Sequence, residues 1–256
     1  MSESRFTPEH ARQFAAAGFV VVPQLASVQR VRELREVALA HLAGGIGPAE
    51  YEADLHYPGA PYSRDAPGGT TLRRLLQAYA RDPAFRHWAV APELAVPLRR
   101  LLGPNVMLSQ AHHNCVMTKQ PRFSSETGWH QDIRYWSFER PELVSVWLAL
   151  GHEFLDNGCL SFLPGSHDVE FASERLNDAA FLRDDIAQNQ ALIATRLTPV
   201  LEPGDAVFFH CRTMHAAGSN HTSEIKLSLV FSYHAADNHP QAGTRSASLP
   251  SVRIST

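Results

Sequence analysis

From Val106 onward the chain consists of short apolar or alternating runs separated by turn residues. The turns are Asp156-Asn157-Gly158, Pro164-Gly165-Ser166 and Glu202-Pro203-Gly204-Asp205, which are residue types that reverse a chain. Several short strands punctuated in this way indicate an antiparallel β-sandwich or barrel. The predicted strands occupy 106–117, 143–151, 159–163, 206–209 and 226–234.

The first hundred residues carry mostly helical patterns. Thr7-Pro8-Glu9 predicts a helix start and Gly18 its end, and Phe19 to Val22 form an apolar β-branched run typical of a strand. Apolar residues at helical spacing predict further helices at 27–44, 71–81 and 92–102, and a charged stretch near 173–190 also has a helical pattern. The Gly-, Pro- and Tyr-rich segment 46–70 is typical of a lid or binding loop.

No linker divides the chain, so we expect one domain over 1–256. Its predicted fold class is mainly β with flanking α, an antiparallel double sheet with N-terminal helices packed outside. Residues 1–104 form the helical flank and lid-like loop, 105–236 the core and 237–256 a tail.

Composition argues against several classes of partner. The 256 residues have a net charge of −3 and an isoelectric point near 6.5, which favours neither nucleic acid nor an anionic membrane surface. No apolar run approaches the roughly 18 residues of a membrane span, and the N-terminus lacks the apolar region of a secretory signal. We therefore expect a cytoplasmic protein whose three cysteines, Cys115, Cys159 and Cys211, are reduced thiols.

The tripeptide His130-Gln131-Asp132 is followed after 82 residues by His215. On an extended strand, residues i and i+2 point to the same side, so His130 and Asp132 can reach one ion while Gln131 faces away. Two imidazoles and one carboxylate are the ligand set of non-haem Fe(II) oxygenases, which leaves three positions open. A His-x-Asp tripeptide alone is a weak signal, but with the downstream histidine it indicates a candidate metal site.

The surrounding sequence resembles the phytanoyl-CoA dioxygenase family of Fe(II)/2-oxoglutarate oxygenases. The matching blocks, from about residue 7 to 236, are Gly18-Phe-Val-Val-Val-Pro23, Lys119-Gln-Pro, Trp129-His-Gln-Asp132, Asn157-Gly-Cys-Leu-Ser-Phe-Leu-Pro-Gly-Ser-His167, Pro203-Gly-Asp205, His210 and His215-Ala-Ala-Gly-Ser-Asn220. The resemblance implies a double-stranded β-helix (jelly-roll) core. It also implies that His130, Asp132 and His215 bind Fe(II), with 2-oxoglutarate and O2 as co-substrates and succinate and CO2 as products. Halogenases of this broad class lack the carboxylate, so Asp132 favours oxygenation, most simply hydroxylation of a small-molecule metabolite.

The resemblance also implies a cation for the far carboxylate of 2-oxoglutarate. The family usually has an arginine eleven residues after the distal histidine, and this chain has Lys226 there. A hydroxyl that the family often has two residues after that histidine is also missing, since Ala217 occupies the position. Arg212 and Lys119 are alternative cations.

Relatives place a Gln and an Asn, four apart, beside 2-oxoglutarate, and Gln110 and Asn114 reproduce this spacing. These amides can equally satisfy nearby backbone. Trp147 stands near the position of a tryptophan that borders the co-substrate in relatives, although a core aromatic residue is the alternative.

Substrate contacts are predicted for Arg134, Tyr135 and Trp136, which follow the motif, and for His112 and His113, one of which should face inward. Two other functions stay open at this point. One is a cupin-type dioxygenase that does not use 2-oxoglutarate and takes His210 as its third histidine. The other is a non-catalytic jelly-roll binding protein. The sequence determines neither the substrate nor the oligomeric state.

Overall fold

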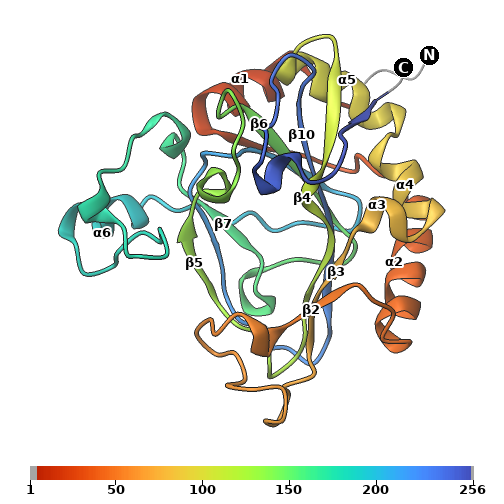
Figure 1. The fold of residues 1–256 in the computed structure, drawn as a ribbon, viewed down its shortest axis with the longest axis vertical. Helices are drawn as coiled ribbons and strands as arrows, with labels where there is room; N and C mark the ends of the chain where they lie inside the picture. Colours follow the sequence, from red (N-terminus) through yellow and green to blue (C-terminus); the bar gives the residue numbers. More distant parts are fainter. Residues whose placement is uncertain (1–4, 255–256) are drawn as a thin grey trace.

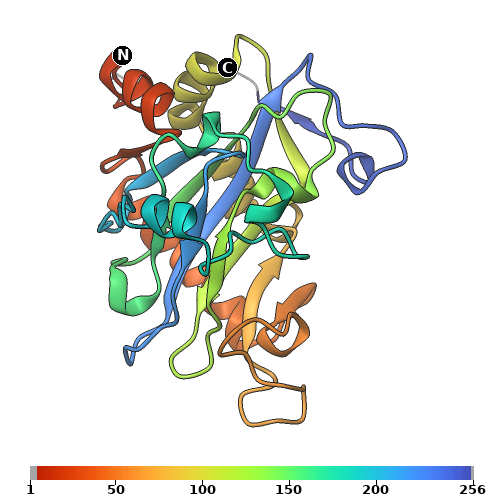
Figure 2. The ribbon, with the colours of Figure 1, turned by 90° about the vertical axis from the view of Figure 1, so that its left-hand side faces the viewer.

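A computed structural model describes residues 5–254, which form two antiparallel sheets with the N-terminal helices on one side (Figures 1 and 2). The larger sheet has the strand order β1-β8-β6-β10-β4-β3-β2, with β11 also paired to β4. The smaller sheet has the order β5-β9-β7. The strands of the larger sheet are β1 (Phe19–Val22), β2 (Ala49–Tyr51), β3 (Leu72–Leu76), β4 (Val106–Lys119), β6 (Leu143–Ala149), β8 (Ala206–His210), β10 (Lys226–Ala235) and β11 (Val252–Arg253). Those of the smaller sheet are β5 (Thr127–His130), β7 (Leu160–Phe162) and β9 (His215–Ala217).

Alternation along the strands creates two separate apolar cores. On β8, Val207 and Phe209 point between the sheets, where they meet Phe162 of β7. Phe208 of the same strand points the other way, into the core that the helices cover. Because successive side chains of a strand face opposite sides, one strand supplies both layers. The arrangement confirms the predicted mainly β, jelly-roll-like fold with helices packed outside.

Helices α1 to α5 cover the outer face of the larger sheet, whereas α6 lies at the far left of Figure 1, beside β5. In Figure 1, α2, α3 and α4 lie on the right, outside β3 and β4, whereas β5 and β7 lie on the left. The first helix begins and ends where the sequence predicts, with Thr7 as N-cap and Gly18 in the left-handed region at φ 80°. Leu34, Trp88 and Leu98 anchor the helices in the core. The helices are α1 (Pro8–Ala17), α2 (Val28–Ala43), α3 (Ala78–Arg81), α4 (Pro83–Ala89), α5 (Pro92–Leu102) and α6 (Ala187–Ile193).

Two helical predictions are wrong. Residues 72–76 form strand β3, which pairs with β4 through Arg74 opposite Met117, and helix begins only at Ala78. The run Leu-Arg-Arg-Leu-Leu fits either period over so few residues, and pairing with β4 decides the outcome. The charged segment 173–190 is mostly irregular, with α6 at its end. Asn189 holds it together by donating to the carbonyls of Arg175 and Arg183.

Strand β4 carries an irregularity that shapes the space between the sheets. Its pairing with β10 jumps from Asn114 opposite Phe231 to Ser109 opposite Ser232. Residues 110–113 therefore have no partner on β10, and all four of them line the cavity between the sheets. Bulges of this kind re-aim side chains and are frequent beside active sites.

The segment predicted as a tail packs back onto β4. Val252 of β11 lies opposite Leu108, and a short 3-10 helix, η6 (Arg245–Ala247), precedes β11. In residues 5–254, no helix is long and apolar enough to cross a membrane.

Candidate metal centre and cavity

His130, Asp132 and His215 converge between the two sheets. Oδ1 of Asp132 lies 3.8 Å from Nε2 of His130 and 3.7 Å from Nε2 of His215. The three ligand atoms lie within 4.8 Å of one another, and Asp132 and His215 are buried. The strands explain the meeting, since β5 and β9 are neighbours in the smaller sheet with His130 directly opposite His215.

Both imidazoles are held by backbone carbonyls on the side away from Asp132. Nδ1 of His130 lies 2.8 Å from the carbonyl of Gly128, and Nδ1 of His215 lies 3.0 Å from that of Thr213. A proton on each Nδ1 leaves each Nε2 lone pair directed at the common centre. Burial, and secondarily the neighbouring His215, lower the pKa of His130 well below its usual value, which favours the neutral, ligating form.

The strand argument for the His-x-Asp spacing holds with one adjustment. Strand β5 ends at His130, Gln131 stays extended at φ −104° and ψ 135°, and Asp132 begins the 3-10 helix η2 (Asp132–Tyr135). The side chain of Gln131 turns away and donates to the carbonyl of Arg212 at 2.5 Å. One extended residue between the two ligands is enough to bring them to the same side.

These residues fit a metal ion. Oδ2 of Asp132 is buried and has no hydrogen-bond partner among the described residues. A buried carboxylate oxygen without a partner is costly unless a cation or donor satisfies it. The neutral imidazoles and the single carboxylate form the ligand set of non-haem Fe(II) enzymes.

Comparison with known proteins assigns the chain to a family. The model of the phytanoyl-CoA dioxygenase family matches residues 14–228. The chain belongs to the phytanoyl-CoA dioxygenase family. It is 28% identical to human peroxisomal phytanoyl-CoA dioxygenase over 247 residues, covering 91% of this chain and 70% of that protein. It is 24% identical to a probable alpha-ketoglutarate-dependent hypophosphite dioxygenase of Stutzerimonas stutzeri, covering 92% and 81% of the two chains.

Solved structures agree with the fold. The epimerase SnoN from nogalamycin biosynthesis superimposes with a TM-score of 0.73 at 25% identity, covering 91% of this chain and 84% of that one. Iron-bound EctD from S. alaskensis gives a TM-score of 0.79 at 21% identity, covering 100% and 89%. The protein is therefore an Fe(II)/2-oxoglutarate-dependent dioxygenase with His130, Asp132 and His215 as its metal triad.

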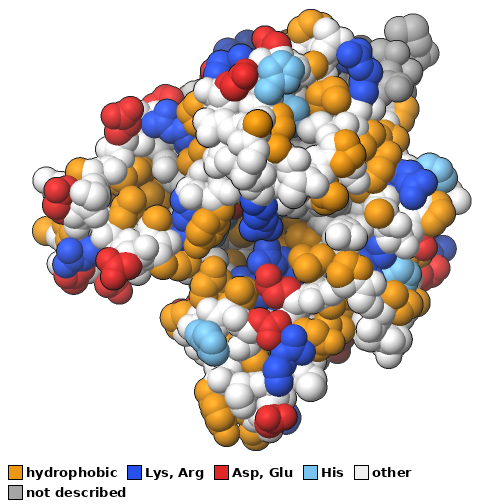
Figure 3. Space-filling model, viewed as in Figure 1, with side chains coloured by type: hydrophobic (Ala, Val, Ile, Leu, Met, Phe, Trp, Pro, Cys, Tyr) orange, Lys and Arg blue, Asp and Glu red, His pale blue; other side chains and the backbone are white. Residues whose placement is uncertain are grey.

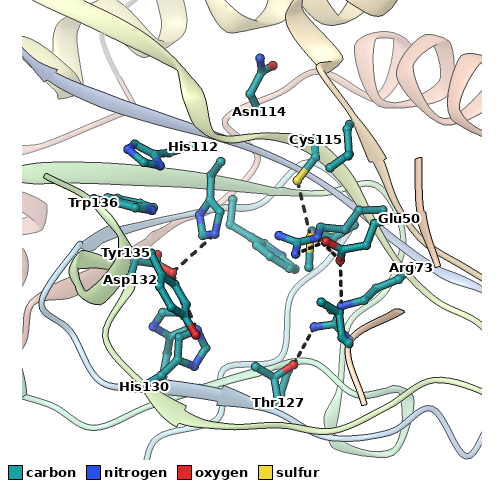
Figure 4. A pocket seen from close by; sticks show the side chains of 18 of the residues that line it. Glu50, Arg73, His112, Asn114, Cys115, Thr127, His130, Asp132, Tyr135 and Trp136 are labelled. Carbon is teal, nitrogen blue, oxygen red and sulfur yellow. Dashed lines mark hydrogen bonds and ion pairs between the residues drawn. The ribbon is translucent and has the colours of Figure 1, made fainter. Parts of the chain in front are cut away.

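A cavity of about 530 Å³ opens from the triad of this dioxygenase toward the surface. Figure 4 shows the triad residues His130 and Asp132 on one side and Glu50, Arg73 and Thr127 on the other. Its volume falls within the roughly 300–1,000 Å³ of pockets that enclose small organic ligands.

Lys226 lies in the cavity wall and is almost fully buried. Its Nζ is 3.3 Å from Glu153 Oε2 and 3.1 Å from Ser228 Oγ, and it lies 4.9 Å from the ring centre of Trp147. The indole of Trp147 donates to both oxygens of Glu153, at 3.1 and 3.2 Å. Trp147 and Lys226 are thus neighbours in the wall, held by one buried carboxylate.

Three other cations join Lys226, and we call the four residues Arg73, Arg74, Lys119 and Lys226 the cationic end of the cavity. Three carboxylates balance three of these cations. Arg74 donates to both oxygens of Glu50 at 2.7 Å. Glu52 lies 3.4 Å from Arg73, and Glu153 pairs with Lys226. Lys119 forms no ion pair within residues 5–254, and its ammonium donates to the carbonyl of Ser125. The cationic end therefore has one positive charge in excess.

The excess charge lies on an unusual residue. Lys119 and Lys226 are the only lysines of the chain, against 21 arginines, and they are directly opposite each other on β4 and β10. Burial, followed by repulsion from Arg73 and Lys226, lowers the pKa of Lys119 to about 7.

The predicted amide pair does not act as a pair. Asn114 accepts from the backbone N–H of Tyr79 at 2.8 Å and donates to the carbonyl of Gln110 at 3.2 Å. In Figure 4 its side chain points away from the metal residues. Gln110 donates to the carbonyl of Pro250 at 2.7 Å. The bulge at 110–113 lies between the two amides, and both residues line the cavity while their amides are engaged by backbone groups.

Both histidines of the bulge line the cavity, whereas only one was expected to face inward. Nε2 of His113 lies 3.5 Å from Asp132 Oδ1, on the metal side. His112 stacks on Trp136 with ring centres 4.8 Å apart and an interplanar angle of 24°. Burial lowers the pKa of His112 to about 3, so this ring is neutral.

Arg134, Tyr135 and Trp136 also line the cavity, as predicted for residues that follow the motif. The guanidinium of Arg134 donates to the carbonyls of Ala179 and Ala180 and lies 4.0 Å over the ring of Phe181. Tyr135 is half exposed at the cavity mouth, and Trp136 is buried behind it.

The residues considered as alternatives, His210 and Arg212, lie outside the metal site. His210 faces Phe14 and His167 and accepts from the backbone of Arg212, so it does not belong to the metal group. Arg212 donates to the carbonyl of Val169 and does not line the cavity. The cupin-type reading with His210 as ligand is therefore wrong, and Arg212 is excluded as the co-substrate cation. The three cysteines are free and buried, in line with reduced thiols.

Several cavity residues escaped the sequence analysis. Arg73 and Arg74 were assigned to a helix, and Arg245 and Leu249 to a tail. Glu153 stands in a loop and carries no motif of its own. For Arg73 and Arg74, the signal available was an adjacent arginine pair in an otherwise apolar run, which is unusual for a buried strand.

Proposed function

We propose that this dioxygenase oxidises a small-molecule metabolite, most directly by hydroxylation, in the cavity beside the triad. The observation that carries the proposal is the one-sided metal site, in which His130, Asp132 and His215 approach from the smaller sheet and the opposite side faces the cavity. Bound iron and 2-oxoglutarate supply the oxidative chemistry, with succinate and CO2 as products, while the protein positions the bond to be oxidised.

The cationic end is the proposed place for the far carboxylate of 2-oxoglutarate. Lys226 occupies the expected position, and Lys119 stands opposite it with no acidic partner. Opposite residues of antiparallel strands hold their Cβ atoms about 4.5–5.5 Å apart, so two ammonium groups can share one carboxylate. The anion would neutralise the excess charge that burial makes costly. Trp147 would form the wall beside it.

Glu153 holds the ammonium group of Lys226 in place. The carboxylate of Glu153 pairs with the ammonium of Lys226 at 3.3 Å inside the protein, so the buried charge has a partner. It also holds the flexible lysine stem in one place, which partly replaces the fixed fork of the arginine found in relatives. Lys226 therefore acts as an oriented point charge.

The residues around the triad have different roles. The carbonyls of Gly128 and Thr213 fix the imidazoles, and Nε2 of His113 lies 3.5 Å from Oδ1 of Asp132, where it would help to orient the carboxylate. Trp136 and Tyr135 shield the mouth from water. A closed, oriented site directs oxidation to one bond of the bound molecule.

The test is succinate formation by iron-loaded protein supplied with 2-oxoglutarate and O2. Slow succinate release without added substrate, and faster release with a true substrate, is the expected result. Candidate metabolites that accelerate it would be examined by mass spectrometry for a gain of one oxygen atom. No iron-dependent succinate under any condition would overturn the proposal. The cytoplasmic location stays a prediction.

A further inference from the structure

The mouth of the cavity has its own charged residue, Arg245 on η6. Arg245 lines the cavity and is exposed, and its guanidinium makes no ion pair or hydrogen bond to any residue in the range 5–254. Figure 3 shows Lys and Arg side chains in the central hollow, with Asp or Glu side chains below them and hydrophobic side chains around the rim. An arginine without a partner at a cavity mouth is available to a ligand.

The backbone that carries Arg245 is fixed. The neighbouring Ser246 is buried, with its hydroxyl 2.7 Å from His112 Nε2 and 2.8 Å from the backbone nitrogen of Ser137. Strand β11 then ties the same segment to β4. Arg245 therefore projects from a pinned position and not from a free tail.

The surroundings of Arg245 are aromatic and apolar. His112 stacks on Trp136, and His113 meets the same indole edge to face at 5.3 Å. Leu249 lines the mouth from the same segment, and Tyr135 is 52% exposed there. His113 connects this wall to the metal centre through its 3.5 Å approach to Asp132.

Charge at the mouth is not balanced by acids. Glu50 and Asp132 are the acidic residues that line the cavity in the described part of the chain. Glu50 is taken by Arg74, and Asp132 belongs to the metal. A ligand with a negative charge would compensate the positive charge of Arg245, which has no acidic partner at the mouth.

We propose that the substrate is an organic anion, with an apolar, ring-sized body against the Trp136 and Leu249 wall and a carboxylate or phosphate on Arg245. This inference rests on the proposed function, because it names the substrate class of the same cavity. A guanidinium binds carboxylate and phosphate with two parallel hydrogen bonds, which fixes orientation as well as charge. The anion at the mouth would direct the other end of the molecule toward the triad.

The test uses a matched set of probes, 2-naphthoate, 2-naphthyl phosphate and the uncharged 2-naphthamide. Binding to anaerobic, iron-loaded protein saturated with 2-oxoglutarate is measured by quenching of tryptophan fluorescence. At least one anion should bind about tenfold or more tightly than the amide, the range expected for hydrogen bonds to a charged group. Which anion binds more tightly identifies the group that Arg245 prefers.

Variants assign the effect to Arg245. Arg245→Ala should remove the preference for the anion, Arg245→Lys should keep part of it, and the KM for 2-oxoglutarate should stay unchanged in both. Arg253→Ala is the matched control, since Arg253 is an exposed arginine on the same segment but outside the cavity. Equal binding of anions and amide by the unaltered protein, or a preference that survives in Arg245→Ala, would overturn the inference.

Succinate formation, measured on the same samples, separates the two proposals. Iron-dependent succinate with no preference for anions would leave the oxygenase proposal standing and refute only the substrate class. An anion preference without succinate would show that the cavity binds organic anions through Arg245, but it would refute the oxygenase proposal and with it the role of the anion as a substrate.

Discussion

The metal centre and the cationic end lie in one cavity but are built in different ways. The metal centre uses two imidazoles from neighbouring strands and one carboxylate from η2, which follows β5, and each imidazole is held by a backbone carbonyl two residues away. The cationic end uses basic groups from β3, β4 and β10, of which three are paired with carboxylates and Lys119 donates to a carbonyl. The first is fixed by local backbone geometry, whereas the second exists only because distant segments meet.

This difference has energetic consequences. Removing one member of a buried charged network leaves the others uncompensated, which is strongly destabilising. Replacing a metal ligand should damage the fold less, because the groups that anchor the imidazoles are backbone carbonyls, which carry no net charge. Substitutions in the triad should therefore abolish activity before they lower stability. Substitutions at the cationic end should lower stability and the affinity for 2-oxoglutarate together.

The largest effect is expected for Asp132→Ala. Loss of the carboxylate should reduce succinate formation by more than about 100-fold, the upper figure for a group that merely orients a metal ligand. Iron content after gel filtration should fall in parallel, with little change in melting temperature. Asp168→Ala, at an 80% exposed side chain, is the control. Turnover that survived in Asp132→Ala would contradict the assigned triad.

Lys226→Ala should raise the KM for 2-oxoglutarate by about ten- to hundredfold, the value of a hydrogen bond to a charged group. Affinity for Fe(II), measured anaerobically, should change little. Arg212→Ala provides a cation control outside the cavity. Equal loss of iron and 2-oxoglutarate binding would show that Lys226 supports the fold and not the co-substrate.

A pH effect should come from Lys119. Its lowered pKa of about 7 means that the free protein carries this charge below pH 7 and loses it above. The dissociation constant of 2-oxoglutarate should therefore rise above pH 7, by at most about tenfold per pH unit for linkage to one proton. Lys119→Arg should flatten the dependence.

The two lysines make this effect directly observable. After reductive methylation with ¹³C-formaldehyde, the side-chain signals come from Lys119 and Lys226 alone. The signal that titrates near pH 7 and is missing from Lys119→Arg should move to higher pH when 2-oxoglutarate is added. A titration that 2-oxoglutarate leaves unchanged would remove Lys119 from the co-substrate site.

The smallest effect on co-substrate binding is expected for Asn114→Ala. Its amide serves the backbone of Tyr79 and Gln110, so the KM for 2-oxoglutarate should change less than about twofold while stability falls by about 1–3 kcal/mol. Thermal unfolding and a 2-oxoglutarate titration measure the two quantities. A large KM change without loss of stability would restore the predicted co-substrate role.

What could be predicted from the sequence depended on short-range geometry. The strands at 143–151, 206–209 and 226–234 follow from apolar alternation and turn residues, and α1 follows from Thr7 and Gly18. Where the apolar spacing fits both a helix and a strand, as at 71–81, pairing with β4 made part of the segment a strand although a helix was predicted. The irregular segment 173–190 depends on the buried Asn189, and no periodic pattern in the sequence predicts such a contact.

By itself the sequence determined the metal triad, because one extended residue between His130 and Asp132 is enough to place both on one side, and the family pattern supplies His215. Only the tertiary structure decided which charges share the cavity. It brought Arg73, Arg74 and Glu153 to the lysines, turned Asn114 away through the bulge of β4, and folded Arg245 back to the mouth. Long-range strand pairing and burial set these positions, and neither leaves a trace in the spacing of neighbouring residues.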